Sequence, residues 1–501
     1  MSKDELIEFG WNDNDLNKES LLEKGIFELR FAARKVGVTS PTTQSKGELV
    51  DNILNILSGN TLPDERDKRR GRPPVPNFLE RKSTTAQPAQ KSDTDEGEAH
   101  TDVPYQNLPP RSNTLKESAP LFDNDLEVRE GILDIHPDGY GFIRVKNCEY
   151  DEKDAYIHAA KIKRLGLRCG DVIKGQCRMT NDGKPSMVII ISVNGLHVEE
   201  LNKRPYFDDL KPIFPDEKFC LECGDSRNDF AIRSIDLIAP IGKGQRALIV
   251  SPPKAGKTTL LKKIAKGISI NYPEVLLLVL LIDERPEEVT DIQRSIKGEV
   301  VYSTFDETPE HHTMAAEILL NKAKRHVELG KDVVIMMDSL TRLARAYNAT
   351  IPPTGRTLSG GIDPAALQNP KKFFGAARNV EHGGSLTIIA TALIDTGSRM
   401  DDVIYEEFKG TGNMEIHLDR RLSEKRIFPA IDLNKSSTRR EDLLLTPQEL
   451  DAVWGIRRLL SSGDTVEATE KLMTIMMKTK NNGEFVDQMN KMMQSMKKGN
   501  S

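Results

Sequence analysis

The spacing of apolar residues changes along this chain of 501 residues, and each spacing predicts a different kind of element. Over residues 20–57, apolar side chains recur at intervals of three and four, the period of an amphipathic helix. From 128 to about 195, short strand-like runs are separated by turn signals such as Asp138-Gly139 and Asp182-Gly183. From about 205 to 445, unbroken apolar runs alternate with helical segments. The pattern therefore predicts a helical module, a strand-rich domain and a larger α/β domain.

Each of the two strand-containing regions indicates a particular architecture. The first has five short strands with turns between them, which is typical of a small Greek-key barrel of the oligonucleotide-binding (OB) type, as in cold-shock proteins. The second has apolar runs at Ala247–Val250, Val275–Ile282, Val333–Met337 and Leu386–Ala390. Such runs are typical of a parallel sheet covered by helices on both faces. Residues 447–501 are helical and rich in methionine, which we interpret as core filler.

Residues 58–127 differ from the rest because they are rich in proline, serine and charged residues and have almost no apolar periodicity. This composition predicts a disordered linker. Within it, Lys68–Pro74 reads KRRGRPP, which could lie along a nucleic-acid groove or could simply be a solubilising run of charge. We therefore expect a helical module at 1–57, a disordered linker at 58–127, a barrel at 128–195, a motor domain at 196–446 and a helical tail at 447–501.

Composition narrows the classes of function that this chain can have but does not identify one. Lysine and arginine number 71 against 76 acidic residues, so a surface for nucleic acid must come from local clustering of charge. Cys220 and Cys223 form a lone C-x-x-C, for which reduced thiols are a better interpretation than zinc or redox chemistry. The first eleven residues do not resemble a signal peptide, and Val275–Ile282 is too short to cross a bilayer. We expect a cytoplasmic protein that makes no contact with a membrane.

A phosphate-binding loop is the strongest motif. Ser251–Thr259 reads SPPKAGKTT and lies between an apolar strand and a helical segment. There, backbone N–H groups and a helix N-terminus converge on anionic oxygens. Lys257 should reach the β- and γ-phosphates of ATP, and Thr258 should hold Mg²⁺. The loop departs from the usual pattern at Ser251, where a glycine is common.

Two further strands end in acidic residues. Val275–Ile282 runs into Asp283-Glu284-Arg285, and Val333–Met337 runs into Asp338. Ligands of a parallel sheet bind at the carboxyl ends of its strands, so both carboxylates should converge on the phosphates. Asp338 suits a ligand of Mg²⁺ or of its water, and Glu284 suits a general base that orients the attacking water. The alternative is that either residue only caps a helix or stabilises a turn.

The barrel carries candidate chemistry for RNA. Tyr140 and Phe142 are two residues apart, hence on one face of a strand, and Arg144 continues that face. Such rings form a stacking platform for unpaired bases, which Tyr156 and the basic residues Lys161, Lys163, Arg164 and Arg168 could extend. The alternative is that the rings fill the barrel core. We favour the platform, because the neighbouring turn and Arg144 should place this face near solvent.

With these residues in view, the chain resembles the family of bacterial transcription termination factors called Rho across nearly all of 128–495 and in the helical module. The resemblance rests on these stretches: PPKAGKT, LLIDERPEEV, KGEVVYSTFDE, DSLTRLARAYN, KKFFGAARNVEHGGSLTIIATALIDTGSRMDDVIYEEFKGTGNMEIHL and EKRIFPAID. It implies a RecA-like motor, an RNA-dependent ATPase and helicase for RNA and RNA–DNA hybrids. Such a motor moves 5′ to 3′ on single-stranded RNA and dislodges RNA polymerase. Loops of this family also lack the opening glycine.

The resemblance further implies a homohexamer with ATP sites between subunits. Arg439 matches an arginine finger given by a neighbour, Arg426 a second interface arginine, and Arg285 a contact to the terminal phosphate. Phe428 matches an aromatic residue that packs on adenine. The phosphate loop and carboxylates on the other side of each site correspond to Lys254, Ala255, Gly256, Lys257, Thr258, Thr259, Glu284 and Asp338.

The RNA contacts implied by the resemblance lie in the barrel and in two loops of a central pore. Tyr140, Phe142, Arg144 and Tyr156 match the primary RNA site, and the aromatic residue expected near the last barrel strand appears as Met187. The pore loops correspond to Ile351–Asp363, which contains Arg356, and to Asp395–Arg399. Arg356 and Arg399 stand where lysine is usual, which keeps the charge but changes its shape.

Two other classes of protein share parts of this pattern. A rotary ATP synthase subunit or an export ATPase would share the motor and the arginine finger, but its N-terminal barrel would lack the Tyr-Gly-Phe platform. A cold-shock-like RNA-binding protein would need only 128–195, leaving the phosphate loop and the carboxylates unexplained.

Overall fold

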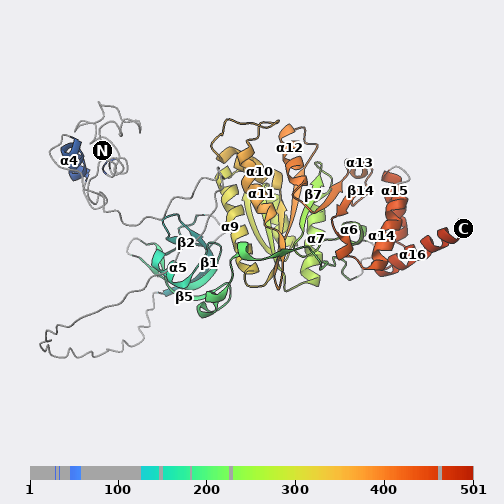
Figure 1. Ribbon diagram of the computed structural model, residues 1–501, viewed down its shortest axis with the longest axis horizontal. Coiled ribbons are helices and arrows are strands. Elements are labelled where there is room, and N and C mark those ends of the chain that lie inside the picture. The colour runs from blue at the N-terminus through green and yellow to red at the C-terminus, as the bar shows by residue number, and fades with distance from the viewer. Residues whose placement is uncertain are drawn as a thin grey trace, which may run out of the picture. The chain divides into compact units, whose positions relative to one another are not determined.

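The computed structural model describes Leu29, Ala33 and residues 46–57, 126–145, 150–180, 183–224, 229–460 and 465–499 (Figure 1). Most of the first predicted helix, the KRRGRPP stretch and nearly all of the predicted linker lie outside the described residues. Within the unit formed by residues 1–114, helix α4 (Lys46–Leu57) buries Leu49, Val50 and Ile53. These positions confirm the second amphipathic helix predicted for the N-terminal module.

The second unit, residues 115–501, begins with a closed barrel whose strands follow the order β1-β2-β3-β5-β4. Its core takes alternate residues of the strands, including Leu133, Ile143, Ile157 and Ile173. The five-stranded barrel predicted from the strand-and-turn pattern is therefore confirmed. Its elements are β1 (Leu126–Ile135), β2 (Gly141–Arg144), β3 (Ala155–Ile157), helix α5 (Ala159–Leu165), β4 (Val172–Met179) and β5 (Pro185–Val193).

The motor is built on a sheet with the strand order β14-β13-β7-β12-β10-β8-β9. All neighbours along this path are parallel except β14, which runs antiparallel to β13. The strands are β7 (Arg246–Ser251), β8 (Leu276–Glu284), β9 (Glu299–Thr304), β10 (Asp332–Asp338), β12 (Ser385–Leu393), β13 (Met414–Leu418) and β14 (Ile431–Thr438). Short strands β6 (Pro212–Ile213) and β11 (Arg378–Val380) extend it beside β12. All four predicted strand runs are confirmed.

Helices cover both faces of this sheet, as the unbroken apolar strands require. Ala247 and Ile249 of β7 enter the core on one face, whereas Leu248 and Val250 enter the core on the other. The first core includes α6 (Phe230–Ile238), α7 (Lys257–Asn271) and α8 (Pro286–Ser295). The second includes α9 (Pro309–Val327), α10 (Leu340–Thr350), α11 (Gln368–Gly375) and α12 (Arg399–Lys409). Helix α13 (Arg420–Glu424) follows β13.

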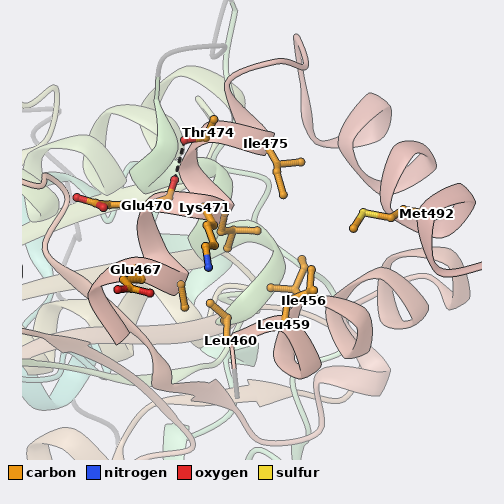
Figure 2. Close-up of a pocket in the computed structure, with 11 residues that line it drawn as sticks. Ile456, Leu459, Leu460, Glu467, Glu470, Lys471, Thr474, Ile475 and Met492 are labelled. Carbon is orange, nitrogen blue, oxygen red and sulfur yellow. Dashed lines mark hydrogen bonds between the residues drawn. The ribbon is translucent and has the colours of Figure 1, made fainter. Parts of the chain in front are cut away.

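The chain ends in α14 (Pro447–Leu460), α15 (Thr465–Met476) and α16 (Asn482–Gly499). Met476 and Met489 pack in the same core as α7, which confirms that these two methionines fill space. An apolar hollow of about 660 Å³ lies among the three helices, where Ile456 and Leu460 of α14 face α15 and Met492 of α16 (Figure 2). Among the described helices, none is long and apolar enough to span a membrane.

Candidate functional site

The phosphate-binding loop follows β7 and leads into α7. Gly256 has φ 88°, a left-handed conformation that glycine adopts without strain, and it forms the N-cap of α7. Helix α7 begins at Lys257, so Thr258 lies in its first turn and Thr259 beside it. The free N–H groups of this turn make the loop a ready anion site. Ala255 is buried against the core and fixes the base of the loop, while Lys254 is exposed.

Both acidic residues predicted at strand ends lie beside this loop. Lys257 Nζ is 2.6 Å from Asp338 Oδ1 and 3.9 Å from Glu284 Oε2. Asp338 ends β10 and also accepts a hydrogen bond of 2.9 Å from Thr391 Oγ1. Since β8 and β10 are adjacent and parallel, their carboxyl ends bring Glu284 and Asp338 to one edge of the sheet. The expected convergence of the two carboxylates on the loop is confirmed.

Glu284 is the more perturbed of the two carboxylates. Its side chain is nearly fully buried, and its Oε2 has no hydrogen-bond partner among the described residues. Burial and the charge of Asp338 raise its pKa, while Lys257 and Arg342 act in the opposite direction. A buried carboxylate oxygen that no described residue satisfies is suited to accept a hydrogen bond from a reacting water. The geometry thus fits a general base.

Arg342 is a neighbour of this carboxylate that the sequence reasoning did not single out. Its guanidinium lies 4.0 Å from Glu284 Oε1 and 3.5 Å from Asp283 Oδ2. Asp283 has φ 55°, and the pairing of β8 with β9 shifts register between Ile282 and Glu284. The sequence feature that could have identified Arg342 is its position. It lies one turn after Asp338, in the first turn of the helix that leaves the carboxyl edge of the sheet.

A hollow of about 300 Å³ opens beside the phosphate loop. It is lined by Gly256, Thr259 and Leu260 on one side and by Leu418 and Phe428 on the other. The Phe428 ring is half exposed there, which leaves a face available for a planar ligand such as adenine. Arg426 is exposed and lines an adjoining hollow together with Lys254 and Phe428. The structure therefore brings these predicted residues together.

The remaining predicted arginines lie at opposite edges of the sheet. Arg285 is exposed and precedes α8, at the same edge as Glu284. Arg439 directly follows β14. The last residue of β14 pairs with Met414 of β13, and Met414 pairs with Ala247 of β7. Arg439 therefore lies at the edge of the sheet where β7 begins. The phosphate loop follows the other end of β7, about 13 Å away along the strand. Arg439 is exposed at the edge opposite its own phosphate loop.

Three aromatic rings form one cluster on the outside of the barrel. The ring centroid of Tyr140 lies 5.8 Å from those of Phe142 and Tyr156, and the Phe142 and Tyr156 centroids are 6.0 Å apart. Phe142 and Tyr156 are direct partners across β2 and β3. All three are half-buried and lie outside the barrel core, which instead takes Ile143. The interpretation that these rings fill the core is therefore wrong, and the geometry fits a stacking platform.

Two details of the barrel differ from expectation. Arg144 was expected near solvent, but it is 4% exposed and forms ion pairs with Asp134 and Asp154 at 2.6 and 2.7 Å. It lies on the predicted strand face, yet carboxylates from β1 and from the segment before β3 enclose it. Met187 lies inside the barrel core, so it does not occupy an aromatic position of the platform. The residue of β5 that pairs with Tyr156 is Ser186.

The two loops assigned to a pore meet in space. Gly360, in the loop 351–363, packs so closely on the second loop that a Cβ would lie 2.8 Å from the carbonyl carbon of Arg399. Arg399 is the first residue of α12, and both it and Arg356 are exposed. Thr396 donates a hydrogen bond of 2.6 Å to Asp401, which also pairs with Arg345 of α10. Two exposed arginines thus project from loops that support each other.

The fold and these sites define a P-loop ATPase that carries its own barrel for unpaired nucleic acid. Residues 231–438 match the nucleotide-binding domain of the ATP synthase alpha/beta family, and residues 129–199 match the RNA-binding domain of the Rho termination factor. The chain therefore has both an ATPase domain and an RNA-binding domain, which neither a rotary ATPase subunit nor a cold-shock-like protein would have.

Individual relatives specify the family. The transcription termination factor Rho of Aquifex aeolicus is 58% identical over 369 residues, which cover 72% of this chain and 84% of that protein. The Rho of Bacillus subtilis is 56% identical, covering 73% and 86%. A type III secretion ATPase structure is similar at 23% identity and a TM-score of 0.47, covering 62% of this chain and 94% of its own. This chain belongs to the Rho family of transcription termination factors and is an RNA-dependent ATPase and helicase.

Proposed function

We propose that six copies of this chain form a ring that hydrolyses ATP between subunits, moves 5′ to 3′ on single-stranded RNA and releases the transcript from RNA polymerase in the cytoplasm. The position of Arg439 is the observation that supports the proposed ring. An exposed arginine at the edge opposite its own phosphate loop cannot serve that loop, but it can serve the loop of an adjacent copy. Each ATP site then needs two subunits.

In this proposal, the residues of one subunit bind and activate the nucleotide. Lys254, Ala255, Gly256, Lys257 and Thr259 hold the phosphates, and Phe428 packs on the adenine. Glu284 orients the attacking water and accepts its proton, for which its unsatisfied Oε2 is suited. Arg285 stabilises charge on the terminal phosphate from the same subunit.

The metal and the arginines at the interface complete the site. The hydroxyl of Thr258 and the carboxylate of Asp338 fit the hard oxygen ligands that Mg²⁺ prefers, and the ion would neutralise charge on the phosphates. Arg439 of a neighbouring copy, assisted by Arg426, adds positive charge to the transition state. A cation that arrives from another subunit makes hydrolysis sensitive to the geometry of the ring.

RNA is held in two places. Tyr140, Phe142 and Tyr156 stack on bases at the barrel, and buried Arg144 supports Phe142 from below, with its guanidinium 5.2 Å from the ring centroid. Arg356 and Arg399 meet the RNA backbone in the pore. We retain the division into module (1–57), linker (58–127), barrel (128–195), motor (196–446) and tail (447–501) as part of this proposal.

One experiment tests the proposal as a whole. ATP hydrolysis by the full chain is measured with and without poly-cytidine RNA, and native mass spectrometry is recorded on the same sample. We expect strong stimulation by RNA and a mass of six copies. A stimulated monomer would contradict shared ATP sites, and an assembled ring without stimulation would contradict coupling to RNA.

A further inference from the structure

The barrel rests directly on helix α9 of the motor. Gly170, in the barrel loop before β4, has φ 91°, and a Cβ there would lie 2.3 Å from the carbonyl carbon of Asn321 on α9. Ile132 of β1 is buried in the same apolar core as Leu319 of α9. At this contact the backbone of one domain touches the backbone of the other, with no room for a side chain.

A buried carboxylate joins the two domains at the end of α9. The side chain of Glu328, the residue after this helix, is inaccessible to solvent. Its Oε2 is 2.8 Å from Arg168 Nη1 of the barrel, and its Oε1 accepts a hydrogen bond of 2.9 Å from the backbone N–H of Phe207. Arg325 of α9 adds a second ion pair at 2.9 Å. Glu328 is thus bound at once by Arg168 of the barrel, by Phe207 in the segment between the barrel and the motor sheet, and by Arg325 of α9.

Arg168 makes further contacts with the segment that follows the barrel. Its guanidinium donates to the carbonyl oxygens of Pro205 and Arg204 and lies 3.8 Å from the ring centroid of Tyr206. Arg204 in turn forms an ion pair with Asp171, whose side chain is also inaccessible to solvent. The carboxylates of Glu328 and Asp171 are inaccessible to solvent, so a tilt of the barrel that separates Glu328 from Arg168 would remove a charged partner that water cannot replace.

The other end of α9 lies beside the ATP site. His312, in its first turn, is buried, and its Nδ1 is 2.7 Å from Ser303 Oγ at the end of β9. Phe305, two residues later, donates its backbone N–H to the carbonyl oxygen of Glu284. Helix α9 has 19 residues, which corresponds to about 28 Å. Helix α9, which lies next to the barrel in Figure 1, therefore contacts the barrel near one end and the end of β9 at the other, and the residue after β9 bonds to the backbone of Glu284.

We propose that Arg168 and Glu328 are positioning residues for RNA-dependent ATP hydrolysis. Their buried ion pair fixes the barrel on α9, so that RNA held on the aromatic platform acts on the motor through this helix. Neither residue belongs to the cluster of three aromatic rings, and neither lines the hollows beside the phosphate loop. Breaking the pair should leave both ligands bound while reducing the effect of one on the other.

The test uses the full chain with Arg168→Met, which keeps the length and bulk of the stem but removes the charge. Glu328 then retains Arg325 and the Phe207 N–H, so the fold should persist. The matched control is Lys174→Met, which removes a barrel cation from an exposed pair with Glu130 at 3.7 Å. For each variant, the affinity for a cytidine oligonucleotide, the ATPase rate without RNA and the RNA concentration for half-maximal stimulation are measured.

For Arg168→Met we expect RNA affinity and unstimulated hydrolysis within about two-fold of the parent chain. The RNA concentration for half-maximal stimulation should rise by roughly five-fold or more, the lower range of coupling between sites. Arg168→Lys should recover part of the effect, and adding Glu328→Gln to Arg168→Met should produce little further change. Stimulation like that of the parent would overturn the proposal. So would a parallel loss of RNA affinity, which would mean that the pair merely maintains the barrel.

Discussion

At the scale of single residues, the ATP site depends on charges that are shielded from water. Lys257 lies between two carboxylates, and one of these, Glu284, has an oxygen without a hydrogen-bond partner in the described part of the chain. A buried unsatisfied oxygen lowers stability, so its persistence is typical of a group that acts on a ligand. Asp338, by contrast, is satisfied by Lys257 and Thr391.

Replacing this carboxylate separates chemistry from binding. Glu284→Gln keeps the size of the side chain but removes the base, so hydrolysis should fall by roughly 10²–10⁴-fold. Nucleotide affinity should remain, whereas Lys257→Ala should weaken nucleotide binding itself. Titration with a fluorescent ATP analogue and a steady-state ATPase assay distinguish the two. Near-normal turnover in Glu284→Gln would remove this residue from the role.

The acidic side of the pH profile reports on the same group. Burial and the neighbouring charge of Asp338 raise the pKa of Glu284, so it takes up a proton at a higher pH than an exposed glutamate does. The base is then lost as the pH falls through this raised pKa. We expect kcat at saturating RNA and ATP to decline at a pH clearly above about 4.3, the usual value for glutamate. A decline only at or below that value would contradict the assignment.

Spacing along the chain identified the loop and the two carboxylates of the ATP site but misjudged the exposure of Arg144 in the barrel, whereas the expectation at Met187 came from the resemblance. Loop, strand and helix signals are local, so they placed Lys257, Glu284 and Asp338 correctly. The burial of Arg144 depends on Asp134 and Asp154, which belong to other segments of the barrel. Met187 faces the barrel core opposite Cys177, and the pairing of β4 with β5 shifts register twice along this stretch. Neither effect can be read from the spacing within one strand.

At the scale of elements, the two proposed RNA sites differ in their physical character. The platform on β2 and β3 presents apolar rings, whereas the paired loops present exposed arginines. Stacking on rings responds weakly to salt, because no phosphate charge is neutralised, while contacts to phosphates weaken as salt displaces them. Loss of one site should therefore be distinguishable from loss of the other.

Two variants test this division of labour. Phe142→Ala should cost roughly 1–3 kcal/mol of RNA affinity with little change in its salt dependence, and Phe142→Tyr should retain most of the affinity. Arg399→Ala should leave affinity at the barrel nearly intact but blunt the stimulation of ATPase by RNA. RNA binding and stimulated hydrolysis are followed across a salt series. Normal binding by Phe142→Ala would disprove the platform, and full stimulation of Arg399→Ala would disprove the pore contact.

At the scale of the whole molecule, strand direction decides where the catalytic groups lie. Apolar runs were enough to predict a parallel sheet, but they did not reveal that β14 is antiparallel. That reversal carries Arg439 to the edge away from its own phosphate loop. The resemblance to relatives implied the role of Arg439, and the topology gives a physical reason why the proposed role would require a second copy.

Mixing of inactive subunits tests this arrangement. Arg439→Ala and Lys257→Ala copies should each be inactive alone, because every site lacks one essential cation. In mixed rings, some interfaces pair an intact loop with an intact Arg439, so part of the activity should return. ATP hydrolysis is measured at several mixing ratios, with mixed assemblies verified by native mass. No recovery in verified mixed rings would count against an arginine supplied by a neighbour.

The half-buried aromatic platform of the barrel should have a consequence for the folding equilibrium as well as for recognition. Tyr140, Phe142 and Tyr156 keep part of their apolar surface in contact with water in the free protein. A ligand that covers this surface binds the folded barrel and not the unfolded chain, so by mass action it raises the free energy of unfolding. Unpaired RNA should therefore protect the barrel against heat and proteases. A transcript bound on this platform should therefore also prolong the lifetime of the domain that holds it.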